Sequence, residues 1–394
     1  MNKQALIQRA RAIFSDEHTW FRDSVATFVE REITPRQVVI REQRRIPRDV
    51  WTAAGASGFL GLGIAEQYGG SGSADFRFNA VLQEELAAAG MAYASCLGIH
   101  TDVVAPYLTE LTTDDQRERW LPGFCDGSRV TAMAMTEPEA GSDLAALRTR
   151  AARHDDGWVL SGSKTFITNG LAADLVIVAA RTDRGPASQA ITLFAVERDM
   201  PGFVRGRKLE KIGQHEADTA ELFFEDVFVP DENVLGEVGR GFVHMMERLP
   251  QERLSAACAN IAHAAAAVSR TLEYVRERRA FGRPIGTFQA NRFALAEMAT
   301  LIDVTRAYVD QCLMDHVNGT LSAVDAAKAK WWTADVQNAV IDRCVQLFGG
   351  YGYMSEYDVA RAWADARVTR IWAGSNEIMK EVIGRALGLA DEPG

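Results

Sequence analysis

The chain has 394 residues, of which 47% are hydrophobic and 24% are charged, and its formal net charge at pH 7 is -10. This composition is typical of a folded globular protein, and the length allows two or three domains with sizeable cores. The negative charge excludes an overall electrostatic attraction to nucleic acid. A short basic run at residues 276–279 is typical of a solvated helix face.

The cysteines have neither the spacing of a zinc site nor the pattern of a disulfide framework. They are Cys96, Cys125, Cys258, Cys312 and Cys344. Residues 1–4 begin an amphipathic segment without the apolar stretch of a signal peptide, and no run of about 18 apolar residues occurs. We therefore expect a cytoplasmic protein with no metal and no membrane segment.

Helical periodicity dominates the first third of the chain. Apolar residues recur at helical spacing, for example at Trp20, Val25 and Phe28. Residues 68–73 form a Gly- and Ser-rich loop, and residues 112–116 have the pattern of a capped helix start. We predict an N-terminal α-helical domain over residues 1–126.

Short β-branched or alternating runs replace this periodicity near Gly127. They lie at residues 130–135, 158–160, 175–179, 191–196 and 222–224. Gly, Asp, Pro and Asn separate them, which is typical of a small antiparallel sheet or barrel. We predict a middle β domain over residues 127–235.

Long helices are predicted for the rest of the chain, residues 236–394. Residues 256–267 have almost no polar side chains, so this helix should pack among other helices. Breaks are expected at residues 282–284 and 348–352, where Gly and Pro occur. The whole chain is thus an α+β protein in α–β–α order, without an evident internal repeat.

Several segments of the chain together resemble one family. Thr-Glu-Pro-Glu-Ala-Gly-Ser-Asp at residues 136–143 follows a β run, and its small residues let backbone amides approach a ligand. The others are residues 164–170, 278–285 and 346–352. In order and spacing, over nearly the whole chain, these segments resemble the flavin-dependent acyl-CoA dehydrogenase family. Residues 250–254 and 360–377 look most like its long-chain and isovaleryl branches.

The resemblance implies a fold and a reaction. The fold is an N-terminal α-helical domain, a middle antiparallel β-barrel and a C-terminal four-helix bundle, with FAD between the last two. In the reaction, a base takes the proton α to the thioester carbonyl of an acyl-CoA while the β-hydrogen leaves as hydride to flavin N5, which gives a trans-2-enoyl-CoA. An electron transfer flavoprotein is the implied electron acceptor, and the implied assembly is a homo-oligomer, usually a tetramer.

Two loops near the flavin are implied to supply cofactor and substrate contacts. Their residues are Met133, Met135, Thr136, Ser142, Phe166, Ile167 and Thr168. Thr168 would offer its hydroxyl or amide to the N5 edge, where negative charge accumulates. Without the resemblance, these loops are ordinary hairpin turns.

A second set of residues matches positions that reach the FAD of a neighbouring subunit. It comprises Arg278, Phe281, Gln289, Gln346, Leu347, Gly349 and Gly350. Arg278 suits a pyrophosphate because its guanidinium can bind phosphate oxygens with two hydrogen bonds. The alternative is a solvated arginine beside a Gly-rich helix end. Ser375 and Glu377 match further cofactor contacts, and Ser142, Arg253 and Gly374 match substrate contacts, Gly374 through its backbone at the thioester.

The catalytic base must be a carboxylate in a dry site that raises its pKa. Short- and medium-chain relatives place Glu just before the glycine that Gly374 matches, but this chain has Ala373 there. Long-chain and isovaleryl relatives use a Glu that matches Glu252, which we therefore predict to be the base. By local sequence alone, Glu252 is also compatible with a surface helix. Glu247 lies about 140 degrees round the helix and should point elsewhere.

Two other functions remain open on the same scaffold. One is an oxygen-reactive acyl-CoA oxidase or flavin monooxygenase, which rapid hydrogen peroxide formation would reveal. The other is a non-enzymatic flavoprotein that binds nucleic acid, for which the acidic composition gives no support. The sequence does not fix the length or branching of the acyl group.

Overall fold

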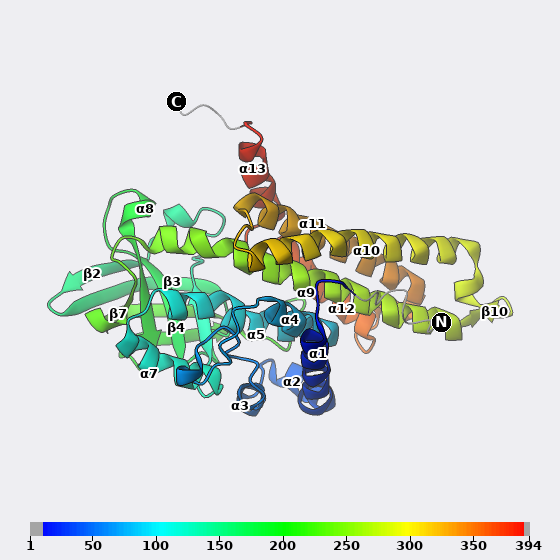
Figure 1. Ribbon diagram of the computed structural model, residues 1–394, viewed down its shortest axis with the longest axis horizontal. Coiled ribbons are helices and arrows are strands. Elements are labelled where there is room, and N and C mark those ends of the chain that lie inside the picture. Colours follow the sequence, from blue (N-terminus) through cyan, green and yellow to red (C-terminus); the bar gives the residue numbers. More distant parts are fainter. Residues whose placement is uncertain (1–10, 390–394) are drawn as a thin grey trace.

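The computed structural model describes residues 11–389, so the predicted amphipathic start at residues 1–4 lies outside the described residues. The N-terminal helices cover one side of the molecule (Figure 1); α1 to α5 share one core, and α6 and α7 pack against the sheet. They are α1 (Asp16–Phe28), α2 (Gln37–Gln43), α3 (Arg48–Ala56), α4 (Arg77–Ala89), α5 (Met91–Gly98), α6 (Ala105–Glu110) and α7 (Asp114–Cys125). A π-helical stretch, Ile99–Val104, joins α5 to α6. The predicted helix start near Thr113 is confirmed, because Thr113 Oγ1 accepts the Gln116 amide hydrogen.

The middle of the chain forms a single mixed sheet. Its strands are β1 (Thr131–Ala134), β2 (Arg150–His154), β3 (Gly157–Thr168), β4 (Leu175–Arg181), β5 (Ile191–Glu197), β6 (Phe203–Lys208), β7 (Thr219–Pro230) and β8 (Val234–Leu235), with a short helix α8 (Ala187–Ala190) before β5. The strand order is β6-β7-β3-β2-β4-β5-β8, and β1 pairs with β4. One face packs on the N-terminal helices and the other has its own apolar core.

The sheet differs in part from the expected antiparallel barrel. The β1–β4 and β2–β4 pairs are parallel, and the other pairs of the sheet are antiparallel. No pairing within residues 11–389 joins β6 to β8, so a closed barrel stays a prediction. The sequence reasoning also missed β2 and β6, whose exposed and charged residues hide the alternation of a strand.

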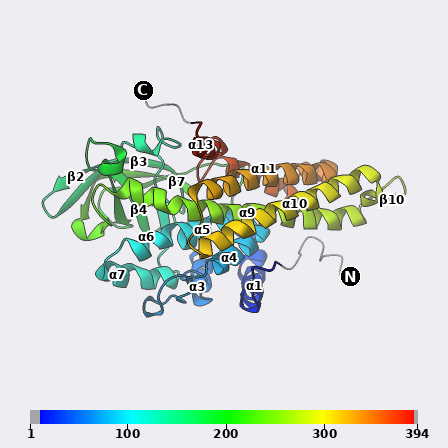
Figure 2. The ribbon, with the colours of Figure 1, turned by 45° about the horizontal axis from the view of Figure 1, so that its top comes forward.

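Long helices extend from the sheet toward the other end of the molecule (Figures 1 and 2). They are α9 (Gly241–Glu277), α10 (Gln289–Val317) and α11 (Ala323–Phe348), followed by the shorter α12 (Asp358–Ala366) and α13 (Asn376–Ala386). A two-stranded hairpin, β9 (Arg279–Ala280) and β10 (Arg283–Pro284), occupies the predicted break after α9. The small residues of α9 let α11 and α4 pack closely on it, as predicted. A regular four-helix bundle stays a prediction.

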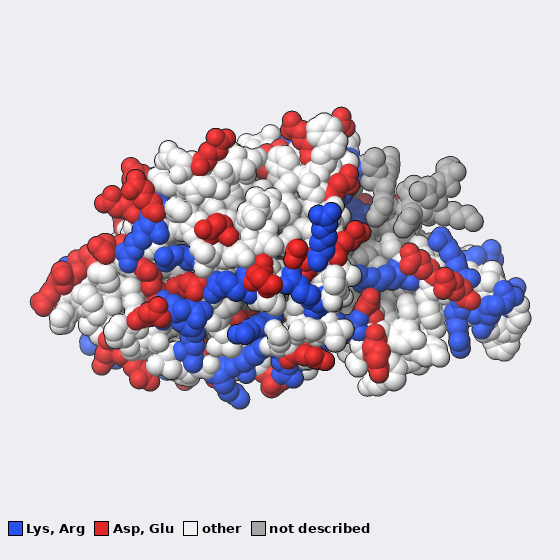
Figure 3. Space-filling model, turned by 90° about the horizontal axis from the view of Figure 1, so that it is seen from below, with Lys and Arg blue, Asp and Glu red and all other residues white. Residues whose placement is uncertain are grey.

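The surface and interior have three features that bear on function. All five cysteines are buried, and burial raises the pKa of their thiols. On the face in Figure 3, basic side chains lie next to acidic ones. Within residues 11–389, no helix combines the length and the apolar character needed to cross a membrane.

Candidate active site

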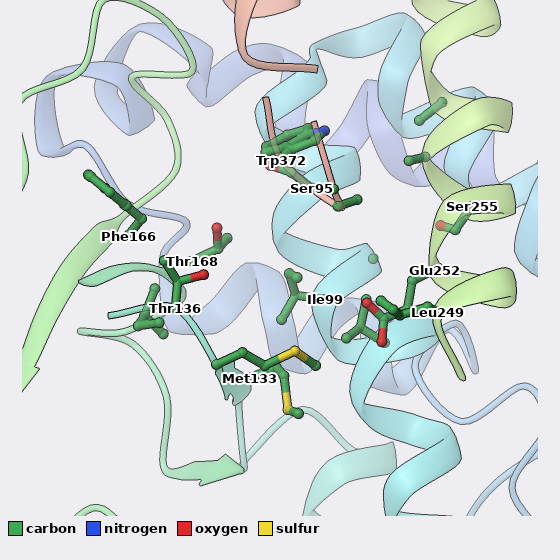
Figure 4. Close-up of a pocket in the computed structure, with 18 of the residues that line it drawn as sticks. Ser95, Ile99, Met133, Thr136, Phe166, Thr168, Leu249, Glu252, Ser255 and Trp372 are labelled. Carbon is green, nitrogen blue, oxygen red and sulfur yellow. The ribbon is translucent and has the colours of Figure 1, made fainter. Parts of the chain in front are cut away.

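A cavity of about 270 Å³ lies where the N-terminal helices, the sheet and α9 meet. Figure 4 shows that β-domain residues face residues of α9 across it, with Trp372 at one side. The labelled β-domain residues are Met133, Thr136, Phe166 and Thr168, and those of α9 are Leu249, Glu252 and Ser255. Most of the lining is apolar, so a charged group in the cavity is poorly solvated.

Glu252 is the carboxylate that faces this cavity. It follows Pro250, which lies inside α9 and cannot donate the helical hydrogen bond to the carbonyl of Met246. Burial raises the pKa of Glu252 to about 7, although Arg253 and the hydrogen bond from Tyr107 oppose this rise. The Tyr107 hydroxyl donates to Glu252 Oε1 at 3.4 Å. A carboxylate with this pKa can both accept and hold a proton near neutral pH.

The helix α9 is fixed at this point by hydrogen bonds to the π-helical stretch. Gln251 Nε2 donates to the carbonyl oxygen of Asp102 at 2.7 Å, and Ser255 Oγ donates to the Asp102 carboxylate at 2.5 Å. Asp102 is buried and also accepts from Asn79 Nδ2 at 2.8 Å. These contacts lie on both sides of Glu252 in the sequence and hold its backbone in place.

The β-domain wall of the cavity is held by a buried ion pair. Lys164 Nζ lies 2.8 Å from Glu137 Oε1 and also donates to the carbonyl oxygen of Met135 at 2.9 Å. A β-bulge between β3 and β7 follows at residues 164–167, and Phe166 there has a φ of 59° and is 67% exposed. The bulge turns the Phe166 ring to the cavity mouth while Lys164 stays inside.

The third wall is the turn before α13. Trp372, Ala373 and Gly374 line the cavity, and the latter two have φ values of 51° and 84°. Ala373 carries no carboxylate, so this wall supplies backbone and an indole instead. Trp372 Nε1 is buried and has no hydrogen-bond partner among residues 11–389. Lys330 Nζ donates to the carbonyl oxygen of Gly374 at 2.5 Å.

Many of the predicted site residues meet at this cavity. Those that line it are Met133, Met135, Thr136, Phe166, Ile167, Thr168, Glu252 and Gly374. Ser142 is exposed between Gly141 and Leu144, which line the cavity. Arg253 is buried beside the turn, with Nη2 4.0 Å from the position a Cβ would take at Gly374. Ser375 caps α13 by accepting the Ile378 amide hydrogen, and Glu377 is exposed.

The other predicted residues lie away from this cavity, around the end of α9, the start of α10 and the end of α11 (Figure 1). They are Arg278, Phe281, Gln289, Gln346, Leu347, Gly349 and Gly350. The Arg278 guanidinium lies 5.6 Å from the centre of the Tyr351 ring. Arg278 therefore lies next to the glycine-containing segment 346–352, to which Tyr351 belongs. Phe281 at the hairpin tip is 95% exposed. This arrangement is compatible with contacts to another subunit, which stay a prediction.

The sequence reasoning missed Tyr107, Lys330 and Trp372. Tyr107 lies far from Glu252 in the sequence, and no local pattern links them. A burial signal for Lys330 was present in the sequence. The residue shares a helix face with Ala327 and Ala326, which lie three and four positions before it and are buried in the structure. Residues 11–389 contain no group of three or more His, Cys, Asp or Glu side chains that could hold a metal ion.

Family models match three successive parts of the chain. They describe the acyl-CoA dehydrogenase N-terminal domain at residues 15–128, the middle domain at residues 132–227 and the C-terminal domain at residues 239–388. The long-chain specific acyl-CoA dehydrogenase of Mus musculus mitochondria is 46% identical over 96% of this chain and 88% of its own length. The mitochondrial isovaleryl-CoA dehydrogenase of Solanum tuberosum is 37% identical over 95% of this chain and 91% of its own length.

Solved structures agree with these sequence matches. A crystal structure of an acyl-CoA dehydrogenase from Geobacillus kaustophilus has a TM-score of 0.94 and 44% identity, covering 96% of this chain and all of that one. A chain from a study of the electron transferring flavoprotein of Acidaminococcus fermentans has a TM-score of 0.92 and 35% identity. The match covers 97% of this chain and 100% of that one. The chain therefore belongs to the acyl-CoA dehydrogenases, a family of FAD-dependent oxidoreductases that act on CH–CH groups.

Proposed function

We propose that the chain converts an acyl-CoA thioester to a trans-2-enoyl-CoA, with Glu252 as the base. The Glu252 carboxylate takes the α-proton, the electron pair of the broken Cα–H bond forms the new double bond, and the β-hydrogen leaves with its electron pair. When bound, FAD accepts this hydride. The observation that carries the proposal is the Glu252 carboxylate in an apolar cavity, opposite Thr168 and Phe166 (Figure 4).

The walls of the cavity fit a flavin. The Thr168 hydroxyl points into the cavity, and the buried Trp372 Nε1 lacks a partner within residues 11–389 (Figure 4). Both are donors for polar ring edges. We propose that the two loops at Met133–Ser142 and Phe166–Thr168 hold the isoalloxazine ring. Ser375 and Glu377 would add cofactor contacts, and the set at the end of α9 would reach the FAD of a neighbouring subunit.

The turn at Ala373 and Gly374 offers backbone N–H donors to a thioester oxygen. Neither amide N–H donates a hydrogen bond within the described chain, and both residues line the cavity. Negative charge builds on the thioester oxygen as the α-proton leaves, and free donors stabilise it. We propose that this turn binds the thioester, while Ser142 and Arg253 add substrate contacts.

The acyl chain is proposed to lie between α5 and α9. Small side chains line this part of the cavity: Ala94, Ser95, Gly98, Ala256 and Ala259. Ala256 lies one helical turn after Glu252 and so on the same face of α9. A wall of small residues leaves room for a long or branched acyl group, as the names of the relatives suggest.

Assembly and electron transfer are proposed from the family. An electron transfer flavoprotein would take the electrons, a tetramer would complete the FAD site, and fatty acid β-oxidation would use the reaction. We also propose domain boundaries after residues 126 and 235. None of these requires nucleic acid or a membrane.

The test is Glu252→Gln, which keeps the size of the side chain and removes the base. We expect the variant to bind FAD and to be reduced by acyl-CoA about a thousandfold more slowly, because general base catalysis contributes on that order. Anaerobic bleaching of the flavin in a stopped-flow instrument measures this rate. Glu247→Gln is the matched control, since Glu247 is on the same helix but does not line the cavity. Normal bleaching by Glu252→Gln would contradict the assignment.

A further inference from the structure

Lys330 on α11 is a fully buried lysine next to the cavity. Its exposed fraction is 0%. Its ammonium group donates to the carbonyl oxygen of Gly374 at 2.5 Å and to Asn376 Oδ1 at 3.3 Å. Within residues 11–389, no carboxylate forms an ion pair with it at 4.0 Å or less. A buried charge without a counter-ion is costly, so this position needs a specific reason.

A second buried cation lies close to the same turn. Arg253 is 7% exposed, and its Nε has no hydrogen-bond partner in the part of the chain that the structure describes. Its Nη2 comes within 4.0 Å of the position a Cβ would take at Gly374. Two positive side chains therefore lie close to a turn that carries no charge of its own.

The turn itself has little to hold its shape. Ala373 is in the left-handed region, which costs roughly 1–2 kcal/mol for a residue with a Cβ. The amides of Ala373 and Gly374 donate to no acceptor within the described chain. Among the contacts that hold the turn are the bond from Lys330 to the Gly374 carbonyl and the anchoring of Asn376, whose Nδ2 donates to Asp335 Oδ1 at 2.9 Å.

We propose that Lys330 is a positioning residue that holds the Ala373–Gly374 turn with its free amides toward the substrate thioester. The proposal rests on the proposed function, in which these amides donate to the thioester oxygen. The positive charges of Lys330 and Arg253 favour the build-up of negative charge at this oxygen while Glu252 removes the α-proton. Lys330 thus acts through the turn and touches neither the substrate nor the cofactor.

The experiment compares holoenzymes of Lys330→Met and Lys328→Met. Methionine keeps much of the length of lysine and removes its charge and donors. Lys328 is the matched control, because it lies on the same helix, its side chain is 46% exposed, and its ion pair is with Asp325. FAD content is measured first, then anaerobic bleaching by palmitoyl-CoA and by isovaleryl-CoA.

A second measurement isolates proton removal. A 3-thiaacyl-CoA has sulfur in place of the β-carbon, so it can lose its α-proton but has no hydride to transfer. The pH at which the bound analogue loses this proton reports stabilisation of the thioester anion. For Lys330→Met we expect full FAD content, bleaching about tenfold to a hundredfold slower, KM within threefold, and analogue deprotonation about one pH unit higher.

The outcomes separate this proposal from the reaction itself. If Lys330→Met bleaches and deprotonates the analogue like Lys328→Met, the role of Lys330 is wrong while the reaction stands. If neither acyl-CoA reduces the wild type, both are contradicted. Lys330→Gln, which keeps a neutral N–H donor, should fall between wild type and Lys330→Met. If both Lys330 variants lack FAD or do not fold, Lys330 serves stability alone and the proposal is overturned.

Discussion

The two sides of the cavity each contain a fully buried lysine, but the two lysines have different partners. On the β-domain side, Lys164 has the Glu137 carboxylate at 2.8 Å. On the helical side, Lys330 has only the carbonyl of Gly374 and the side-chain oxygen of Asn376 among the described residues. Burial lowers the pKa of both, to about 8 for Lys164, where Glu137 opposes the shift, and to about 7 for Lys330, where Arg253 adds to it.

The difference shows that burial of a lysine serves two purposes in one site. The Lys164 charge is neutralised, so what this lysine supplies is geometry: it ties β3 to the loop that begins at Met135. The Lys330 ammonium has no carboxylate beside it among the described residues, so in its protonated form it also contributes an electric field at the turn that faces Glu252. On the β-domain side the buried lysine thus fixes the position of a loop, and on the helical side it also adds positive charge near the turn.

Breaking the ion pair on the β-domain side should have the largest effect on the protein. Lys164→Met leaves Glu137 buried, with the amides of Arg148 and Thr149 as its remaining donors. Removing one partner of a buried pair costs about 3–5 kcal/mol, and we expect a loss of this size in the free energy of unfolding. Urea denaturation of the holoenzyme measures it.

The double variant Lys164→Met/Glu137→Gln is the control for this stability loss. It replaces the buried carboxylate by an uncharged amide, so it should recover part of the lost stability. An unchanged unfolding midpoint in Lys164→Met would show that the ion pair with Glu137 does not distinguish Lys164 from Lys330.

Narrowing the helical side should have a smaller effect that depends on the substrate. Ala256→Leu places a larger side chain on the face of α9 that carries Glu252, where it would fill the space proposed for the acyl chain. We expect kcat/KM for palmitoyl-CoA to fall at least about tenfold relative to butyryl-CoA, since even one methylene group in an apolar pocket is worth roughly 1–3 kcal/mol. Ala266→Leu, on the same helix but outside the cavity lining, should leave this ratio unchanged.

The smallest expected effect is a shift in pH dependence. The base acts when ionised, so the bleaching rate should rise with pH through about 7, the pKa to which burial raises Glu252. Tyr107 donates to this carboxylate and lowers its pKa, so Tyr107→Phe should move the midpoint to higher pH by about half a unit. A midpoint that stays or falls would show that the bond from Tyr107 does not tune the base.

The sequence predicted the parts of this arrangement that depend on local pattern. The α–β–α order, the helix start at Thr113 and the apolar character of α9 follow from periodicity and capping. The bulge at Phe166 and the parallel pairs of β4 could not be predicted, because they depend on which strands lie side by side. Contacts such as Tyr107 with Glu252 join residues that no spacing rule relates.

The burial of all five cysteines has a practical consequence for studying this enzyme. At neutral pH their thiols stay protonated and out of contact with water, so a maleimide reagent should leave the folded protein unmodified. A single cysteine introduced on the surface, for instance at the hairpin between α9 and α10, would then be the sole reactive thiol. One fluorophore can therefore be attached to each chain without first removing any native cysteine.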